Sequence, residues 1–476
     1  REAVGKDFII IYRLSMIVLI PDGSSWDETV QLAKAIEQAG ATIINTGIGW
    51  HEARVPTIAT SVPRSAFTWV TRKMKQEVSL PLVTSNRINL PSSAEEVLAR
   101  GDADMVSLAR PMLADPEFAK KARTGRADEI NVCIACNQAC LDHTFSNKMS
   151  SCLVNPRACH ETELNYVPTA TPKTFAVVGA GPAGLSAALV LAQRGHRVDL
   201  YDAAAEIGGQ LNMAKVIPGK EEFREMLRYF ERQVELSNIS VHLNARVGAQ
   251  ELKDKNYSAV IVATGVVPRD PGIEGQDHPK VLNYIDVLRH RAPVGERVAI
   301  IGAGGIGFDV ADFLIHDEGH SPTMDLDEWL SEWGVVDPAE ARGGLASDRR
   351  PPQPPAREVT LLQRKKGKLG AKLGKTTGWI HRATLKMNGV QMIGDVNYER
   401  IGDDGLLITY GEKRENPTWL KVDNVVLCAG QEPLHELTEP LESAGVPVHV
   451  IGGADIAAEL DAKRAIDQGS RLAAGL

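Results

Sequence analysis

The first 125 residues alternate between short apolar runs and longer amphipathic stretches. Runs typical of strands occupy residues 8–15, 42–47, 80–85 and 103–108, whereas residues 26–39 and 94–100 have the spacing of helices. Strands that alternate with helices in this way predict parallel βαβ units. The chain therefore has the pattern of an α/β protein from its first residues.

About four such units fit into residues 1–128, which is half of the eight that close a (β/α)8 barrel. A half barrel would leave sheet edges and a core face open to solvent. We therefore predict that these residues form the C-terminal half of a (β/α)8 barrel, and we expect the N-terminal half to lie outside this chain.

A glycine-rich motif follows the next predicted strand. Gly179, Gly181 and Gly184 form G-x-G-x-x-G between an apolar strand and an Ala-rich helix, and Asp202 ends the following strand 18 residues after Gly184. The glycines permit a tight turn and the close approach of a pyrophosphate to the helix N-terminus, while the carboxylate can accept ribose hydroxyls. This combination predicts a dinucleotide-binding module.

A second motif of the same kind contains Gly302, Gly304 and Gly307. A polar, Pro-rich insertion separates this motif from its next strand. That strand ends in Arg364 and Lys365, which are followed by a further lysine. Basic residues at this position favour the 2′-phosphate of NADPH over NADH. The alternative is a solvated basic loop that binds nothing.

Two Rossmann-like domains are thus expected after the barrel segment. Residues 173–290 and 430–476 are assigned to an FAD domain, and residues 291–429 to an NADPH domain inserted into it. The apolar segments 260–265 and 425–430 each end a strand in glycine, and Gly453 and Asp455 precede the last helix, where they can meet flavin ribityl and phosphate groups.

Four of the six cysteines lie within 20 residues, at positions 133, 136, 140 and 152, with the spacing C-x2-C-x3-C-x11-C. Four thiolates can complete a [4Fe–4S] cluster. A structural zinc is the alternative, but it prefers two C-x2–4-C pairs separated by a longer arm. We predict that Cys133, Cys136, Cys140 and Cys152 bind an iron–sulfur cluster, and we assign residues 129–172 to this segment and a linker.

Several polar residues follow strands of the barrel segment, where barrel enzymes place their chemistry. Arg13 and Arg87 end or follow their strands, and Ala109–Arg110–Pro111, which follows the last strand and opens a helical stretch, is a candidate phosphate site. His51 follows a strand and two glycines; position alone favours a structural histidine. Position alone would likewise make Arg54 a solvated surface charge.

The composition narrows the class of protein. The net charge is −8 and no long basic run occurs, which argues against nucleic acid as a partner. The longest apolar stretch, residues 8–20, is interrupted by Arg13 and is shorter than the roughly 20 residues that span a bilayer. Clustered cysteines without a disulfide-rich frame indicate a reducing compartment, so we expect a cytoplasmic protein.

Several segments together resemble the bacterial NADPH-dependent 2,4-dienoyl-CoA reductases of the old yellow enzyme-like family of iron–sulfur flavoproteins. They include GWHEARVPTIATSVPRSAFTWV, TSNRIN, SLARPMLADP, CIACNQACLDH, EIGGQLNMA and LGKTTGWIHR, and the resemblance extends over essentially the whole chain. It implies FMN, FAD, a [4Fe–4S] cluster and NADPH as cofactors. It makes His51 a catalytic acid partner and Arg54 a substrate contact. The implied FMN contacts are Arg13, Arg87, Ala109 and Arg110, and the implied FAD positions are Ala183, Asp202, Gln210, Lys220, Val247, Asp455 and Ile456.

The same resemblance implies a reaction in the β-oxidation of unsaturated fatty acids. Electrons would pass from NADPH to FAD, to the cluster, to FMN and then to a dienoyl-CoA, which becomes an enoyl-CoA. The family's catalytic tyrosine would lie in the barrel half that this chain lacks. Another enoate or enone reductase, an amine dehydrogenase of the same architecture, and an electron-transfer subunit for a separate barrel are the alternatives.

Overall fold

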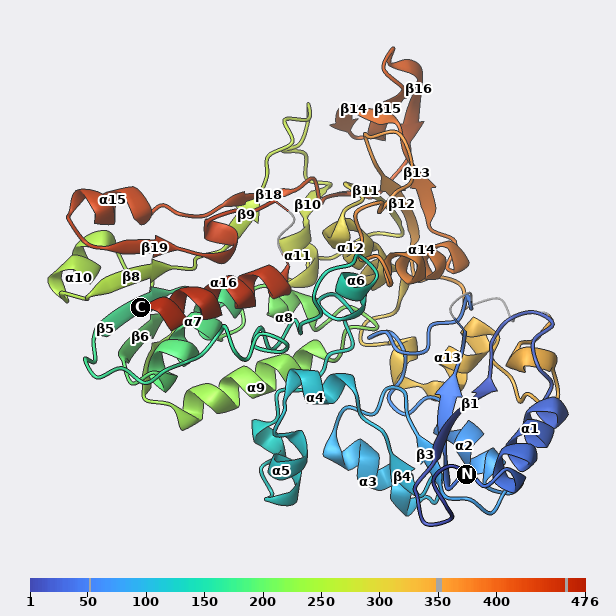
Figure 1. Ribbon diagram of the computed structural model, residues 1–476. Helices are drawn as coiled ribbons and strands as arrows, with labels where there is room; N and C mark the ends of the chain where they lie inside the picture. Colours follow the sequence, from blue (N-terminus) through green and yellow to red (C-terminus); the bar gives the residue numbers. More distant parts are fainter. Residues whose placement is uncertain (51–52, 348–352, 459–460) are drawn as a thin grey trace. The chain divides into compact units, whose positions relative to one another are not determined.

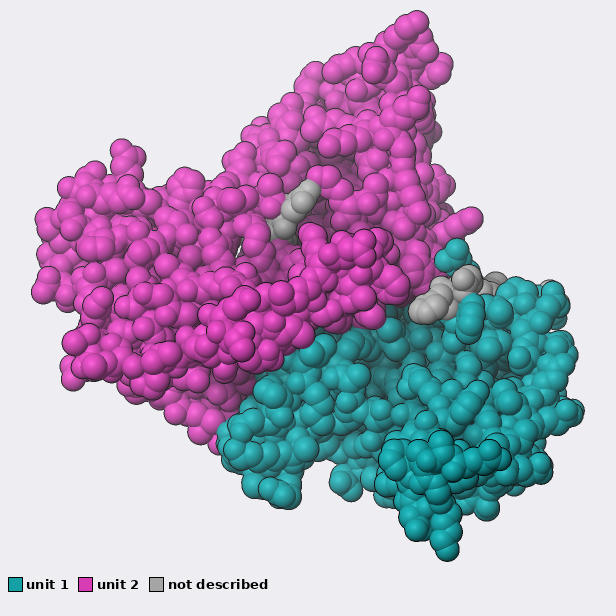
Figure 2. All heavy atoms as spheres, viewed as in Figure 1, with its two compact units in different colours: residues 1–136, 320–353 teal, residues 137–319, 354–476 magenta. Residues whose placement is uncertain are grey.

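The computed structural model describes residues 1–50, 53–347, 353–458 and 461–476. The chain forms two compact units (Figure 2), of which the first contains residues 1–136 and 320–353 and the second residues 137–319 and 354–476. The chain therefore leaves unit 1, forms part of unit 2, returns to unit 1 for one segment, and ends in unit 2.

Unit 1 contains a parallel four-stranded sheet in the order β1-β2-β3-β4 (Figure 1). The strands are β1 (Ile11–Ile17), β2 (Ile43–Ile48), β3 (Leu82–Thr84) and β4 (Met105–Val106). Each coincides with one of the four predicted apolar runs, although β1 begins and ends later than expected. The edge strand β1 exposes Ile11 and Tyr12, which are 57% and 42% accessible. The predicted parallel βα pattern is confirmed.

Helices follow the strands of unit 1. They are α1 (Trp26–Gln38), α2 (Thr68–Met74), α3 (Pro91–Ala99), α4 (Arg110–Ala114) and α5 (Phe118–Arg123), with a 3-10 turn η1 (Ala127–Glu129). Ser25 and Glu28 close a capping box at the start of α1, so this helix begins where the sequence predicts. Helix α2 was not predicted, because no side chain caps its start and its buried face is made partly of threonines.

The segment 320–353 of unit 1 comes from the predicted NADPH domain. It contains η2 (Pro322–Met324), α13 (Leu326–Trp333) and η3 (Arg342–Gly344). Trp329 is buried and meets Phe67 edge to face, with ring centroids 6.0 Å apart. Asp337 forms an ion pair with Lys73, with 2.9 Å between Oδ2 and Nζ. The described residues of the insertion that belong to unit 1, 320–347, are therefore packed, which their polar composition did not predict.

The first module of unit 2 has a parallel five-stranded sheet in the order β19-β8-β5-β6-β7. The strands are β5 (Thr174–Val178), β6 (Arg197–Tyr201), β7 (Ile239–His242), β8 (Ala259–Val262) and β19 (Val448–Val450). The helices and turns of this module are α7 (Pro182–Gln193), α8 (Leu211–Ala214), α9 (Phe223–Leu236), α10 (Ala249–Asp254), α15 (Thr438–Ser443), η4 (Gly452–Ala454) and α16 (Ala462–Gly475). Helix α16 lies along α7 (Figure 1), so the C-terminal residues complete the module that begins near residue 173.

The second module has a parallel sheet with the corresponding order β10-β17-β11-β12-β13. The strands are β10 (Val281–Asn283), β11 (Arg297–Ile301), β12 (Glu358–Leu362), β13 (Gln391–Ile393) and β17 (Asn424–Leu427), and the helices are α11 (Tyr284–Leu288), α12 (Gly305–Ile315) and α14 (Gly378–Met387). In both modules the strand that precedes the glycine motif is central, so both motifs lie at the middle of a sheet.

The remaining elements of unit 2 connect these modules or cover them. An antiparallel sheet contains β14 (Val396–Gly402), β15 (Gly405–Tyr410) and β16 (Glu415–Leu420), and a two-stranded ribbon pairs β9 (Val266–Pro268) with β18 (Gln431–Pro433). Helix α6 (Leu141–Thr144) lies in the cysteine segment. Within the described ranges, no helix is long and apolar enough to cross a membrane.

Candidate functional site

The first glycine motif forms a turn in which two of the three glycines cannot be replaced without a clash. Gly179 has φ +109°, and a Cβ there would lie 2.2 Å from the carbonyl oxygen of Ala263. A Cβ on Gly184 would lie 1.8 Å from the oxygen of Gly179. Gly181 is the N-cap of α7 and faces open space. The N-terminus of α7 is thus open at the position where a pyrophosphate is expected.

Asp202 lies beside this turn, as the motif predicts. Its Oδ2 accepts a hydrogen bond from the backbone N–H of Ala180 at 2.7 Å, and its Oδ1 accepts one from Ala204 at 2.7 Å. Each carboxylate oxygen keeps a further lone pair with which it can accept a ribose hydroxyl. The acid and the glycine turn are therefore held in one arrangement by the backbone.

The second glycine motif repeats this geometry. Gly302 has φ +112°, and a Cβ there would lie 2.3 Å from the oxygen of Cys428. A Cβ on Gly307 would lie 1.8 Å from the oxygen of Gly302, whereas Gly304 faces open space as the N-cap of α12. Ala263 and Cys428 belong to the two apolar segments that the sequence singled out. In each module, that segment packs directly against the first glycine of the turn.

The other predicted FAD positions are distributed over the first module. Ala183 is buried in α7, where its carbonyl oxygen would be 2.3 Å from a Cβ on Gly469 of α16. Val247 is buried, Gly453 is buried in η4, and Asp455 accepts a hydrogen bond from Gln468 at 2.8 Å. Ile456 is exposed. Their roles as cofactor contacts stay predictions.

An ion pair joins the two nucleotide modules of unit 2. Lys220 of the first module donates to both carboxylate oxygens of Asp309 in α12, at 2.6 and 2.7 Å. Both side chains are about one-fifth exposed, so solvent screens the pair only in part. Lys220 was predicted as an FAD position, but Asp309 was not predicted. The signal in the sequence was an acid two residues after the last glycine of the motif, close to the expected pyrophosphate, whose negative charge disfavours it.

His381 of α14 lies within the electrostatic reach of this ion pair. Desolvation, followed by the positive charge of Lys220, lowers the pKa of His381 to about 4. The imidazole is therefore neutral at neutral pH and adds no charge to the region. His381 belongs to the segment LGKTTGWIHR, which carried the resemblance but supplied no predicted site residue.

A second set of polar contacts joins the two nucleotide modules. Gln431 of β18 donates from Nε2 to the hydroxyl of Tyr284 at 2.8 Å and to Oε1 of Gln210 at 3.4 Å. Burial raises the pKa of Tyr284. Gln210, a predicted FAD position, is thus linked through Gln431 of β18 to Tyr284 of α11.

The predicted 2′-phosphate residues follow β12 directly. Arg364 and Lys365 are exposed, and neither forms an ion pair with a carboxylate in the part of the chain that the structure describes. The backbone around them is ordered by Gln363, which donates to the carbonyl of Lys365 at 2.9 Å. These cations are available to an anionic ligand at the place where the fingerprint expects the ribose.

In unit 1, two predicted arginines hold the loop between β2 and α2. Arg87 is buried with φ +56°, and its Nε donates to the carbonyl of Val62 at 2.8 Å. Arg110 donates to the carbonyl of Ile58 at 2.8 Å. Both follow strand ends, β3 and β4 respectively, so the structure brings them to the same loop.

The remaining predicted residues of unit 1 are less closely grouped. Arg13 lies on β1 and donates to Oδ1 of Asn45 at 3.3 Å. Ala109 is the N-cap of α4, and Arg54 is exposed. His51 lies outside the described residues.

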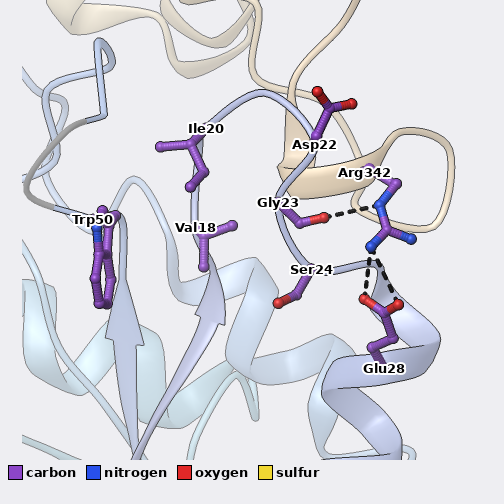
Figure 3. A pocket seen from close by; sticks show the side chains of 8 residues that line it. All are labelled: Val18, Ile20, Asp22, Gly23, Ser24, Glu28, Trp50 and Arg342. Atoms are coloured by element: carbon purple, nitrogen blue, oxygen red, sulfur yellow. Dashed lines mark hydrogen bonds and ion pairs between the residues drawn. The ribbon is translucent and has the colours of Figure 1, made fainter.

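A pocket of about 360 Å³ opens at the carboxyl ends of β1 and β2 (Figure 3). It is lined by Val18, Ile20, Asp22, Gly23, Ser24, Glu28, Trp50 and Arg342. Its volume is at the lower end of the range for small-molecule sites, which suits part of a ligand rather than a whole cofactor. The sequence did not predict it, because Arg342 comes from the insertion.

Of the four predicted cluster ligands, Cys133 is buried and Cys136, Cys140 and Cys152 are partly buried. Cys133 and Cys136 belong to unit 1, and Cys140 and Cys152 to unit 2. Positive φ angles at Ala135 (+54°) and Asn137 (+63°) turn the chain on either side of Cys136. The donor chemistry fits an iron–sulfur cluster. Among the residues that the structure describes, however, no group of three or more His, Cys, Asp or Glu side chains is placed to hold a metal, so the cluster stays a prediction.

The helix between two of these cysteines is anchored to the second nucleotide module. Asp142 of α6 accepts hydrogen bonds from the backbone N–H and hydroxyl of Thr376, at 2.8 and 2.6 Å, and from the N–H of Lys375 at 3.2 Å. Two of the sequence segments that carried the resemblance, CIACNQACLDH and LGKTTGWIHR, therefore meet in unit 2.

Two protein families match the chain. Residues 173–463 match the pyridine nucleotide-disulphide oxidoreductase family, and residues 1–129 match the NADH:flavin oxidoreductase / NADH oxidase family. The first match covers both nucleotide modules together with the insertion. The second covers the four βα units of unit 1.

Similar proteins combine both parts. A metal reductase of Desulforamulus reducens is 33% identical over 458 residues, which are 95% of this chain and 67% of that protein. An NADH oxidase of Thermoanaerobacter brockii is 31% identical over 465 residues, or 95% of this chain and 65% of that protein. The solved complex of 2-naphthoyl-CoA reductase with 2-naphthoyl-CoA has a TM-score of 0.86 at 27% identity and covers 100% of this chain and 66% of its own. The chain thus spans about two-thirds of the length of these proteins.

Proposed function

The chain belongs to the pyridine nucleotide-disulphide oxidoreductase family and joins to it an old yellow enzyme-like flavin oxidoreductase part; on this premise we propose that it serves the NADPH-dependent reduction of 2,4-dienoyl-CoA to enoyl-CoA in unsaturated fatty acid β-oxidation. The net change is the addition of one hydride equivalent from NADPH and one proton from solvent, delivered by a protein acid, across the conjugated diene. FAD, FMN and a [4Fe–4S] cluster supply the redox chemistry when bound, two electrons at the flavins and one at a time at the cluster.

The observation that carries the redox part is the contact between the two glycine-turn modules. Each turn keeps one helix N-terminus open to a pyrophosphate, and the Lys220–Asp309 ion pair fixes one module against the other at 2.6 Å. A flavin on the first module and a nicotinamide on the second must meet for hydride transfer, and effective transfer requires the reacting atoms to be held close together. The ion pair and the Gln431 contacts supply that positioning.

The residues of this chain have distinct roles in the proposal. Asp202 accepts hydrogen bonds from the ribose hydroxyls of the adenosine of FAD. Arg364 and Lys365 bind the 2′-phosphate of NADPH. His51 orients and polarises the acid that protonates the substrate, and Arg54 contacts the thioester. The further FMN contacts proposed are Arg13, Arg87, Ala109 and Arg110, and the cluster ligands are Cys133, Cys136, Cys140 and Cys152.

The thioester class of substrate is supported by similarity to a solved complex. That protein is named 2-naphthoyl-CoA reductase, contains 2-naphthoyl-CoA, and covers the whole of this chain. The segment HEARVPTI, with His51 and Arg54, supports the dienoyl thioester in particular, because it is the most discriminating motif of the resemblance.

Nucleotide choice gives a direct prediction. Replacing Arg364 and Lys365 together by Gln should weaken NADPH binding by about 10²-fold, because charged hydrogen bonds to the 2′-phosphate are worth a few kcal/mol. NADH lacks this phosphate and should lose little affinity. Titration of both nucleotides checks this, with Lys386→Gln, an exposed lysine of α14, as the control. If the affinities for NADPH and NADH fall equally, Arg364 and Lys365 do not bind the 2′-phosphate and are solvated surface residues.

The function itself is tested by the substrate profile of the anaerobic holoenzyme. NADPH oxidation should depend on added 2,4-dienoyl-CoA, and mass spectrometry should show a product heavier by two hydrogens. A saturated acyl-CoA, free cinnamate and a secondary amine serve as comparisons. Reduction of cinnamate without reduction of the thioester would replace the substrate assignment by an enoate reductase, and amine oxidation alone would reject carbon–carbon reduction.

A further inference from the structure

The pocket of unit 1 is closed on one side by a segment that belongs in sequence to the second nucleotide module. Residues 18–25 form the loop that follows β1, and η3 of the insertion lies against this loop. Arg342 is the residue of η3 that lines the pocket (Figure 3). The insertion thus contributes directly to the shape of a cavity at the carboxyl ends of two parallel strands, where barrel enzymes bind their substrates.

The loop after β1 has a backbone conformation that it would not adopt alone. Leu19 and Asp22 have φ angles of +58° and +56°, which are unfavourable for residues with a Cβ. Leu19 is also fully buried. Its N–H donates to the carbonyl of Gly343 at 2.8 Å, and the N–H of Gly343 donates to the carbonyl of Ser24 at 3.1 Å. The backbone of the insertion therefore holds the loop in this conformation.

Gly343 can make these contacts only because it has no side chain. Its φ is +66°, and a Cβ would lie 2.3 Å from the carbonyl oxygen of Ile20. A Cβ on Gly344 would lie 2.2 Å from Cδ1 of Ile17. Both glycines therefore serve the close approach of the insertion to β1 and its loop.

The side chain of Arg342 ties the same loop to α1. Its Nε donates to the carbonyl of Gly23 at 3.0 Å, and its Nη2 donates to the two carboxylate oxygens of Glu28 at 2.9 and 3.2 Å. Glu28 also accepts from the N–H of Ser25, and this bond, with Arg342, lowers the pKa of Glu28. An exposed ion pair contributes little to stability by itself, so its main effect here is on the position of the loop.

The pocket suits a neutral, apolar group. Val18, Ile20 and Trp50 form one wall, while the charges of Arg342 and Glu28 compensate each other on the opposite side (Figure 3). Asp22 remains as an exposed negative charge, which disfavours phosphates and carboxylates.

We propose that the insertion sets the acyl-chain selectivity of the enzyme, with Arg342 as the positioning residue and the pocket as the site of the substrate's hydrocarbon part. This inference rests on the proposed function. Arg342 acts through the loop and touches no reacting atom. It holds the loop that carries Val18 and Ile20, and so determines how much apolar surface the substrate can bury.

The test compares holoenzymes with a series of 2,4-dienoyl-CoA substrates of increasing chain length. Arg342→Ala should raise KM for the longest substrates by about tenfold, which corresponds to the loss of one or two buried methylenes. The KM of the shortest substrate, kcat, and NADPH-dependent dye reduction should change less than twofold. Arg342→Lys should restore part of the loss. Lys34→Ala removes an ion pair of similar exposure on α1 and is the matched control.

A second variant fills the pocket without removing the ion pair. Ile20→Phe should exclude the longest substrates and leave the shortest unaffected, and direct binding of the thioesters should show the same order. Chain-length preference that is unchanged in both Arg342→Ala and Ile20→Phe would overturn the inference while dienoyl-CoA reduction by the parent enzyme continues. Failure of the parent to reduce any dienoyl-CoA would instead reject the proposed function.

Discussion

Gly307→Ala is expected to abolish NADPH oxidation by the holoenzyme. The added Cβ would lie 1.8 Å from the carbonyl oxygen of Gly302, and this oxygen is backbone that cannot move without opening the turn. We expect a loss of about 3 kcal/mol or more in the stability of the second module, because a core clash of this kind cannot relax through a side chain. Thermal unfolding and NADPH titration measure the two effects.

Two neighbouring glycines supply the controls for this prediction. A Cβ on Gly304 or Gly305 meets nothing within 4 Å. Gly304→Ala should therefore keep the thermal stability but lower the affinity for NADPH by about tenfold, since this glycine lets the backbone approach the pyrophosphate. Gly305→Ala, in the first turn of α12, should preserve both properties. If Gly307→Ala binds NADPH with normal affinity, the second module is not the nucleotide site.

The nucleotide modules could be predicted from the sequence because their constraints are local. A glycine turn requires glycine at fixed spacing, and the strand, helix and acid around it are within a few tens of residues. Asp202 accepts bonds from Ala180 and Ala204, so even its side chain is fixed by neighbours in sequence. The apolar runs of unit 1 predicted its four strands for the same reason.

The contacts that the sequence did not predict are those between distant segments. Lys220 and Asp309 are 89 residues apart, and Arg342 and Glu28 are 314 residues apart. No periodicity or motif spacing specifies such a pair, since it arises only when modules pack. The sequence predicted only that a polar, Pro-rich insertion separates two strands of the second module. Its side chains Trp329 and Trp333 are nevertheless buried within unit 1.

The cysteine prediction combines a local sequence signal with an arrangement in space that the sequence does not specify. The spacing specifies four donors, but a spacing does not fix where the sulfur atoms meet. Within unit 2, the N–H of Ser151 donates to the carbonyl of Ala139 at 2.7 Å, so the residues preceding Cys152 and Cys140 are joined by the backbone. Cys133 is held separately in unit 1, where its carbonyl accepts from Asn89 at 2.8 Å. Chemical analysis of the protein can test what the spacing alone leaves open.

Cys152→Ser is expected to remove the cluster while both nucleotide modules stay intact. The anaerobically purified parent should contain about four irons per chain, and the variant close to none, because a cubane needs a thiolate at each iron. NADPH should still reduce FAD at the parent rate, since Gly184, Gly307 and the Lys220–Asp309 pair are unchanged. Reduction of FMN and of the dienoyl-CoA by NADPH should be lost. Iron and sulfide analysis, with stopped-flow absorbance of the flavins, measures these outcomes.

Cys159→Ser is the matched control for this loss. Cys159 lies seven residues further along the chain and is exposed, but it falls outside the four-cysteine spacing. Its replacement should leave the iron content and the coupling between NADPH and substrate unchanged. Stoichiometric zinc without iron in the anaerobic parent would identify the four cysteines as a structural zinc site. In that case electrons would have to reach the substrate site directly from the flavin of unit 2.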